Sequence, residues 1–433
     1  MFNDKISDYV EGVAAKYLSS VDAESKSSNQ HEIGGLIKAE FGKFLGSGRE
    51  DFHYRVRQVY IGEETGDPVI CDGHVTWYDT RRDKPERGSE YRLYYYDSPV
   101  TELMSGGDFF LIAKLRNELL PISGSWENEG VHFRNGSFLM VFAPAGSATE
   151  LQLRAMFGLG QVGPSLKAGK LDAVELLLPL RSMLENLGVE VGSGLPREDD
   201  WLYKLIDKFG GKTFPKTSDF SAFAREHVEI EVSPVASPDT TLMAWMEREE
   251  SFFRVYERYL VKERLAAGFG EDGEDVDAFI DFSLSVQNRR KSRVGHAFEG
   301  HLNYLFKENG LEFQQGRGKD KITENNSKPD FLFPSFSAYH DKTYPTAKLV
   351  MLGAKTTCKD RWRQVLSEAN RISSKHLVTL EPAISEAQTD EMRSHNLQLV
   401  VPAGIHSTYL TKQQAQLFDL SSFIRFVRVL QTG

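Results

Sequence analysis

Residues 328–355, KPDFLFPSFSAYHDKTYPTAKLVMLGAK, contain two short apolar runs, and a charged side chain stands at one end of each run. Asp330 directly precedes FLF, and Lys355 ends LVMLGAK. Runs of this length and composition predict two neighbouring strands. Because neighbouring strands can end side by side, we expect the carboxylate of Asp330 to lie close to the amine of Lys355. The stretch therefore predicts the centre of a short sheet in an α/β domain.

An acid and a lysine at this spacing suit metal-dependent hydrolysis of a phosphodiester. That reaction needs a hard cation held by carboxylates, an activated water and positive charge near the phosphate. The usual nuclease signature has an acid two residues before the lysine, where this chain has Gly353. The nearest replacement is Glu368, on a helix predicted over Asp360–Ile372, and a further acid is Glu299 on an upstream helix. We therefore predict that Asp330 and Glu368 bind Mg²⁺ and that the catalytic set is Asp330, Lys355, Glu368 and Glu299.

A cation–acid–cation run, Lys359-Asp360-Arg361, follows shortly after the lysine. Lysine and arginine pair with guanine O6 and N7, and a carboxylate accepts a hydrogen bond from cytosine N4. The run is therefore predicted to recognise C·G pairs in double-stranded DNA. Two simpler interpretations stay open. Asp360 could only cap a helix, and the supposed catalytic residues could be a Pro-Asp turn, a solvated strand end and a surface helix residue.

The 433 residues are too many for one ordinary domain, so two or three domains are expected. No apolar run is long enough for a transmembrane helix. Residues 1–18 are predicted to form an amphipathic helix and lack the features of a signal peptide. Cys71 and Cys358 offer neither a disulfide framework nor a zinc site, which fits a reducing compartment. We therefore predict a cytoplasmic protein.

Charge is unevenly distributed along the chain. The net charge of −10 argues weakly against nucleic-acid binding, which is driven by lysine and arginine neutralising phosphates. Residues 288–293, however, carry four cations and no acid, and five more cations lie within residues 81–92. Acidic residues accumulate elsewhere, at 198–200 and 271–277. We therefore expect local basic clefts on an acidic body, an arrangement that limits indiscriminate DNA binding.

Hydrophobic patterning divides the chain into a strand-rich first part and a helix-rich second part. An initial helix, a helix near 34–46 and six short runs predict a small barrel or pseudobarrel, the runs being 51–62, 73–80, 89–97, 108–115, 132–143 and 149–157. A closing helix over 171–188 and a hinge follow. The second part is predicted to have helices at 218–228, 240–268 and 275–310, then strands at 328–334, 347–355, 375–381 and 397–402. The fold class is therefore multidomain α+β.

Four strings in the second part resemble the EcoRII family of restriction endonucleases, in the same order: SVQNRRKSRVG (285–295), KPDFLFPSFSAYHD (328–341), KTTCKDRWRQVLSEA (355–369) and LVVP (399–402). The resemblance implies a restriction-endonuclease-like α/β core of the PD-(D/E)xK type. It also implies Mg²⁺-dependent cleavage of double-stranded DNA at CC-x-GG sites, of the form CCWGG. The resemblance also implies that no acid is needed at position 353, where this chain has Gly353. By its pattern the catalytic residues are those predicted above, and the CC:GG pairs are recognised by Lys359, Asp360 and Arg361.

The first part is similar to the effector-binding domain of the same family, a barrel of the plant B3 type. The similarity is carried by NQHEIGG (29–35), GHVTWYDTRR (73–82) and the run 90–115. It implies a B3-like effector domain at 1–178, a hinge at 179–212 and a catalytic and dimerisation domain at 213–433. The residues implied to contact effector DNA are His31, Glu32, Arg81, Arg82, Lys84, Arg87, Glu90 and Arg92.

The family resemblance implies a bacterial, homodimeric type IIE enzyme whose first domain binds a second DNA site as an allosteric effector and otherwise inhibits the nuclease. A cognate DNA methyltransferase would protect the host DNA. Two other functions stay open: a non-cutting DNA-binding regulator, and a nuclease whose barrel senses modified bases. The intact catalytic set argues against the regulator. Other tempting side chains, His296, Tyr339, His340 and His376, are predicted to make packing or phosphate contacts. Trp362 is predicted to lie in the core rather than to stack on a base, and Cys358 to be a small buried side chain.

Overall fold

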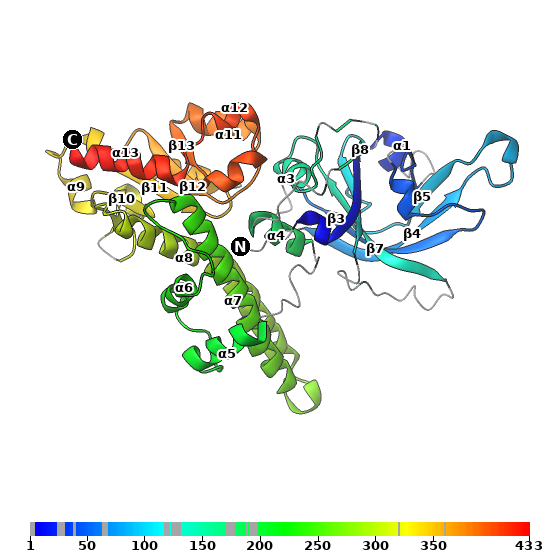
Figure 1. Cartoon of the computed structure of the whole chain (residues 1–433), viewed down its shortest axis with the longest axis horizontal. Helices are drawn as coiled ribbons and strands as arrows, with labels where there is room; N and C mark the ends of the chain where they lie inside the picture. The colour runs from blue at the N-terminus through cyan, green and yellow to red at the C-terminus, as the bar shows by residue number, and fades with distance from the viewer. Residues whose placement is uncertain are drawn as a thin grey trace. The chain divides into compact units, whose positions relative to one another are not determined.

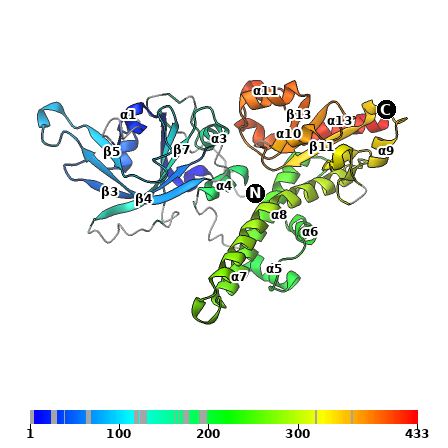
Figure 2. The ribbon, with the colours of Figure 1, turned by 180° about the vertical axis from the view of Figure 1, so that it is seen from behind.

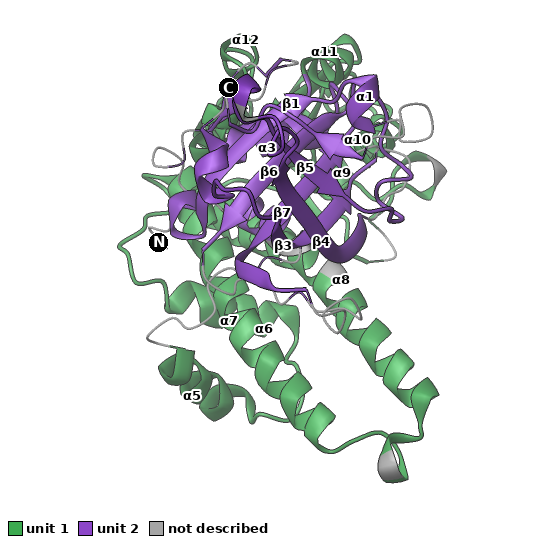
Figure 3. Ribbon diagram, turned by 90° about the vertical axis from the view of Figure 1, so that its right-hand side faces the viewer, with its two compact units in different colours: residues 1, 194–382, 386–433 green, residues 2–193, 383–385 purple. Residues whose placement is uncertain are grey.

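The computed structural model of the chain is shown in Figure 1. The residues that the structure describes are 5–23, 31–37, 40–62, 68–116, 122, 131–160, 162–163, 165, 167–169, 171, 178–187, 189, 198–318, 321–358 and 361–433. They belong to two compact units, which Figure 3 colours separately: residues 2–193 with 383–385, and residues 194–382 with 386–433. Within these described ranges, no helix combines the length and apolar character needed to cross a bilayer.

The N-terminal unit is built on an eight-stranded sheet. Its spatial order is β2-β5-β4-β3-β7-β6-β1-β8, and all neighbours are antiparallel except the parallel pair β3 and β7. The strands are β1 (Val10–Tyr17), β2 (Glu32–Ile33), β3 (Phe52–Tyr60), β4 (Val69–Asp79), β5 (Tyr91–Tyr95), β6 (Phe109–Leu115), β7 (Phe133–Ala143) and β8 (Lys167–Ala168). The helices are η1 (Ile6–Asp8), α1 (Ser20–Ala23), η2 (Phe41–Phe44), η3 (Pro85–Arg87), α3 (Ala148–Met156) and α4 (Leu178–Asn186).

Strand β6 is buried on both of its faces. The run FFLIAKL is buried along its whole length. Phe109 and Leu111 belong to a cluster that includes Leu153 of α3. Phe110 and Ile112 belong to a second cluster on the other side of the strand. Both faces of β6 therefore pack into core, which accounts for its continuous rather than alternating apolar pattern. A B3-like pseudobarrel stays a prediction.

Three local predictions for this unit are wrong. Residues 1–18 were expected to be helical, but 10–17 form β1, because their small and β-branched side chains pair with β6 and are buried on both sides. The run 149–157 was expected to be a strand and is α3, whose N-terminus is capped by the Ser147 hydroxyl accepting a hydrogen bond from the Glu150 amide at 3.2 Å. Near 34–46 only the short η2 is helical in the described part.

The C-terminal unit has a five-stranded mixed sheet in the order β13-β12-β11-β10-β9. β11, β12 and β13 are parallel, and β9, β10 and β11 are antiparallel. The strands are β9 (Gln314–Gln315), β10 (Phe331–Phe333), β11 (Val350–Lys355), β12 (Lys375–Thr379) and β13 (Leu397–Val400). The helices are α5 (Glu198–Phe209), α6 (Thr217–Glu226), α7 (Pro238–Ala266), η6 (Glu271–Gly273), α8 (Val276–Glu308), η7 (Glu324–Asn326), α9 (Phe336–His340), η8 (Thr346–Lys348), α10 (Trp362–Leu366), α11 (Glu386–Ser394), η10 (Ala403–Thr408), α12 (Thr411–Gln414) and α13 (Leu420–Thr432).

Aromatic side chains hold α8 and α13 against one face of this sheet. Phe306 of α8 lies 5.3 Å from Phe331 and 5.5 Å from Phe333, ring centroid to ring centroid. Phe423 of α13 contacts Phe333 at 5.7 Å and His376 of β12 at 5.3 Å. Val365 of α10 packs next to Gly353 of β11. The predicted strands of this unit and its two longest helices are all present.

Helices α7 and α8 lie side by side as a long hairpin, seen from both directions in Figures 1 and 2. The arginine-rich run of α8 faces acids of α7: Arg293 donates to Glu249 at 2.9 Å and Arg290 to Glu257 at 2.6 Å. The expectation that this run forms a basic cleft is therefore wrong for these two arginines, because their charge is neutralised within the hairpin. Helix α5, inside the range predicted as hinge, packs against α7 through Trp201.

Candidate active site

Asp330 and Lys355 form the centre of the candidate site. Phe331 pairs with Leu352 in the antiparallel register of β10 and β11, so Asp330, one residue earlier, lies opposite Gly353. Its Oδ2 accepts a hydrogen bond from the Lys355 Nζ at 2.8 Å and another from the Ala354 amide at 2.7 Å. Burial alone would lower the pKa of the Lys355 amine, but nearby carboxylates, Asp330 first, raise it above its usual value. Lys355 is therefore a fixed cation rather than a base.

Glu368 lies close enough to this pair to interact with it electrostatically. The helix predicted over Asp360–Ile372 is shorter than expected: α10 ends at Leu366, so Glu368 is in the turn that follows. Burial and the negative charge of Asp330 raise the pKa of Glu368 to about 7. Its Oε2 is buried, and within the described residues it has no hydrogen-bond partner. An unpaired buried carboxylate oxygen beside a second carboxylate is a position suited to a cation.

The packing of α10 explains why the acid is not at position 353. A Cβ built on Gly353 would lie 2.9 Å from Cγ2 and 3.2 Å from Cγ1 of Val365, which is fully buried. Any side chain at 353 would therefore push α10 away from β11. An acid on the segment after α10 reaches the same region without that clash.

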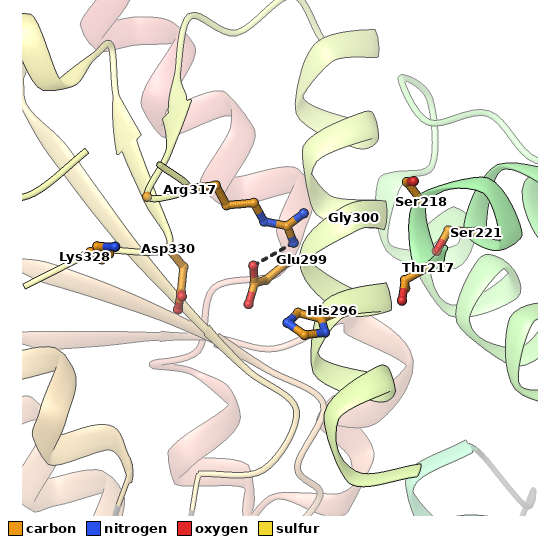
Figure 4. A pocket seen from close by; sticks show the side chains of 10 residues that line it. Thr217, Ser218, Ser221, His296, Glu299, Gly300, Arg317, Lys328 and Asp330 are labelled. Carbon is orange, nitrogen blue, oxygen red and sulfur yellow. Dashed lines mark hydrogen bonds and ion pairs between the residues drawn. The ribbon is translucent and has the colours of Figure 1, made fainter. Parts of the chain in front are cut away.

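Figure 4 shows the cleft that Asp330 lines together with Glu299. Its volume is about 600 Å³, and Glu299 of α8 points into it while accepting a hydrogen bond from Arg317 at 2.9 Å. Among the residues that the structure describes, Lys328 and His296 have no hydrogen-bond or ion-pair partner. The cleft thus combines acids, cations and hydroxyls from four separate segments, and its lining residues are Thr217, Ser218, Ser221, His296, Glu299, Gly300, Gly316, Arg317, Lys328 and Asp330.

Of the three residues predicted to recognise DNA bases, the structure describes only Arg361. Lys359 and Asp360 lie outside the described residues, so both interpretations of Asp360, base recognition and helix capping, stay predictions. Arg361 precedes the first residue of α10 and is exposed. Arg363, the second residue of α10, donates to Glu391 at 3.1 Å. Trp362 and Cys358 are fully buried, as predicted.

The residues predicted to contact effector DNA are brought together at one edge of the N-terminal sheet. Glu32 pairs with Tyr94 because β2 is the edge strand beside β5, and the predicted arm is the connection between β4 and β5. Much of the arm's charge is already neutralised: Glu90 forms ion pairs with both Arg81 and Arg92, and Arg82 pairs with Asp51. His31 is partly buried near Asp97, and the exposed cations of the arm are Lys84 and Arg87.

Several residues of the site carried no sequence signal. Thr217 and Arg317 belong to no motif and are placed in the cleft only by tertiary packing. Conversely, His376 is buried against aromatic rings of α13, and His340 bonds the Ile322 carbonyl at 2.9 Å. In the described part of the chain no group of three or more His, Cys, Asp or Glu side chains could hold a metal ion. The two carboxylates Asp330 and Glu368 still fit Mg²⁺, which is often bound by one or two carboxylates with substrate phosphate and water completing its shell.

The family model for the EcoRII C terminal domain matches residues 253–424. The chain is 44% identical over 211 residues to the type II restriction enzyme EcoRII of Escherichia coli, a match covering 49% of this chain and 50% of that enzyme. It is 30% identical over 126 residues to the type II restriction enzyme SsoII of Shigella sonnei, covering 28% and 40%. The chain thus spans about half the length of the curated relatives it matches.

Among solved structures, metal-depleted Ecl18kI in complex with uncleaved, modified DNA matches with a TM-score of 0.43 and 19% identity, covering 54% of this chain and 85% of that one. A complex of the restriction endonuclease PspGI with substrate DNA matches with a TM-score of 0.39 and 15% identity, covering 55% and 94%. The sequence matches support an EcoRII-like restriction endonuclease: the family model covers residues 253–424, and the match to EcoRII covers 49% of the chain.

Proposed function

We propose that this chain, whose residues 253–424 match the family model for the EcoRII C terminal domain, is a type II restriction endonuclease that hydrolyses double-stranded DNA. The observation that carries the proposal is the contact of Asp330 with Lys355 beside the unpartnered carboxylate oxygen of Glu368. All three residues lie inside the matched domain, and the relatives it matches are type II restriction enzymes. Neither a turn nor a solvated strand end would account for a buried carboxylate oxygen without a hydrogen-bond partner at this point.

We propose Mg²⁺ as the cofactor, held by Asp330 and Glu368. When bound, it would polarise the phosphate and lower the pKa of a water ligand. The raised pKa of Glu368 supports this assignment, since a cation between two carboxylates relieves the repulsion that raises it. Lys355, held charged by its acidic neighbours, is placed to bind a phosphate oxygen and to stabilise the charge that develops on it.

The cleft gives the DNA backbone a place beside these groups. A volume of about 600 Å³ exceeds what one phosphate needs, given that a water occupies roughly 30 Å³. Lys328 is free to contact a phosphate, while Arg317 is tied to Glu299 and would hold that acid at the cleft wall. Phosphate contacts of this kind fix the position of the duplex and carry no base preference.

The finer assignments follow the family resemblance. The proposed site is CC-x-GG, recognised by Lys359, Asp360 and Arg361, and the proposed assembly is a homodimer with one catalytic unit per strand of the near-palindromic site. The N-terminal unit is proposed to bind a second site through the β2–β5–β4 edge and to inhibit the nuclease otherwise. The exposed Lys84 and Arg87 at that edge support a phosphate-binding role. A methyltransferase would protect host DNA.

The test uses plasmids that carry none, one or several CC-x-GG sites, incubated with the full chain and Mg²⁺, followed by sequencing of the ends. Cutting confined to CC-x-GG sites, faster on plasmids with several sites or with a site-bearing duplex added, is the expected result. A fragment starting at residue 194, which keeps α5 packed on α7, should cut a one-site plasmid at least as fast as the full chain. Cutting without site preference, or only on modified DNA, would favour the modification-sensing alternative.

A further inference from the structure

The turn that follows Glu368 is held by side chains from a distant part of the chain. The three backbone amides after Glu368 each donate to one such side chain. The Ala369 amide donates to the Thr323 hydroxyl at 3.4 Å, and the Asn370 amide donates to Glu324 Oε2 at 3.2 Å. The Arg371 amide donates to the Tyr339 hydroxyl at 3.1 Å. None of these contacts involves the Glu368 side chain, so its carboxylate stays available.

Tyr339 is the centre of this arrangement. Its hydroxyl donates to the Glu324 carboxylate, with oxygen–oxygen distances of 2.7 Å and 2.6 Å, while it accepts from the Arg371 amide. Burial, followed by the Glu324 carboxylate, raises the pKa of the Tyr339 phenol, so it keeps its proton. Burial alone would raise the pKa of Glu324, but the hydrogen bond from Tyr339 and those from backbone amides, including that of Asn370, together lower it. One neutral hydroxyl therefore joins a charged carboxylate to the backbone of the turn.

The turn itself has a backbone that needs support. Ala369 has a φ of +49°, in the left-handed region that disfavours residues with a Cβ. On the other side of the turn the Arg371 guanidinium donates to the carbonyls of Ala338 at 3.3 Å and Asp341 at 2.8 Å, and also to those of Tyr339 and Tyr344. An unsupported turn of this kind would relax, and Glu368, one residue before Ala369, would move with it.

We propose that Tyr339, acting through Glu324 and the Arg371 amide, is a positioning residue that fixes where the Glu368 carboxylate sits relative to Asp330. This inference rests on the proposed function, because it assigns Tyr339 a part in metal binding and cleavage. The geometry favours positioning over general stabilisation, since the contacts converge on the three amides directly after the acid. A helix would have fixed Glu368 by itself, but α10 ends at Leu366.

The test compares the full-length chain with Tyr339→Phe, which removes only the hydroxyl. We expect hydrogen exchange at the amides of 369–371 to speed up by at least about tenfold, as their local protection is lost. Mn²⁺ affinity, measured by calorimetry without DNA, should fall by about tenfold, in the range seen when a residue that orients a metal ligand is lost. The maximal cleavage rate should fall by about tenfold or more while the affinity for the site-bearing duplex without metal stays within about twofold.

Tyr54→Phe is the matched control, because the Tyr54 hydroxyl also makes one buried hydrogen bond, to the Leu45 carbonyl at 2.8 Å, in the other unit. It should leave Mn²⁺ affinity and cleavage unchanged. Glu324→Gln keeps an acceptor for Tyr339 and should retain more metal affinity than Glu324→Ala, so partial rescue supports positioning.

Unchanged Mn²⁺ affinity and cleavage rate in a folded Tyr339→Phe chain would overturn the inference. If the wild-type chain cuts no DNA, the proposed function fails. The exchange and Mn²⁺ measurements would then still decide whether Tyr339 positions the acid.

Discussion

Replacing Gly353 by alanine tests the packing argument that moves the acid from position 353 to Glu368. The added Cβ would meet Val365 at 2.9 Å and 3.2 Å, and Val365 is fully buried between β11 and α10. Overpacking of this kind costs about 1–3 kcal/mol. Alanine also restricts the unfolded chain, which offsets about 0.4–1 kcal/mol. We expect a net loss of about 1–2 kcal/mol in the free energy of unfolding.

The assay is urea unfolding of Gly353→Ala, Val365→Ala and the double variant. Val365→Ala alone should cost about 2 kcal/mol for its lost methyl groups. The double variant should lose about 1–2 kcal/mol less than the sum, because the added methyl enters the space that Val365 leaves. Gly73→Ala is the control, since a Cβ at that strand position meets nothing within 4 Å. Additive losses, or a Gly353→Ala chain as stable as wild type, would refute the reasoning.

Three more predictions come from buried or unpaired charges. Burial lowers the pKa of His376 to about 4 from an unfolded value of 6.5, so the contribution of His376 to stability should be constant above pH ~6.5 and fall by up to about 3 kcal/mol as pH drops towards 4. The difference between urea unfolding of the wild-type chain and of His376→Gln should follow this pH dependence, and a difference that does not change with pH would contradict it. Glu249→Gln should cost about 3–5 kcal/mol by leaving the buried Arg293 without its counter-charge, whereas an unfolding free energy within error of wild type would contradict the pairing. Lys328→Ala should weaken DNA binding uniformly across sequences and reduce the slope of log affinity against log salt by about 0.9, while the exposed Lys208→Ala should not.

The central strands and the long helices could be predicted because the residue pattern that specifies each element lies within that element. The run after Asp330 and the run before Lys355 are apolar and bounded by charged or turn residues. The register of β10 and β11 then brings the Lys355 amine to 2.8 Å from the Asp330 carboxylate. Helix α8 was predicted within a residue or two because it has a capping Asp275 at its start and an apolar stripe in its second half, formed by Val294, Phe298, Leu302 and Leu305. Each of these elements is specified by its own residues.

The remaining features depend on partners elsewhere in the chain. Residues 10–17 have a helix-compatible pattern and become β1 because β6 offers a buried edge. The turn at Ala369 depends on Thr323 and Tyr339, far away in sequence, so the end of α10 could not be placed from its own residues. The pairing of the α8 arginines with acids of α7 could not be predicted either, because a basic run taken by itself does not indicate which acids will lie beside it.

The proposed activity is tested most directly by cleavage of a CC-x-GG duplex by the Lys355→Ala chain. Lys412→Ala is the control, because Lys412 is an exposed lysine with its own ion pair to Glu386. The account predicts that Lys355→Ala loses at least about 100-fold in cleavage rate with Mg²⁺. It should still bind the duplex without metal about as tightly as wild type, and Lys412→Ala should cut normally. A folded Lys355→Ala chain that cuts at the wild-type rate would contradict the proposed active site.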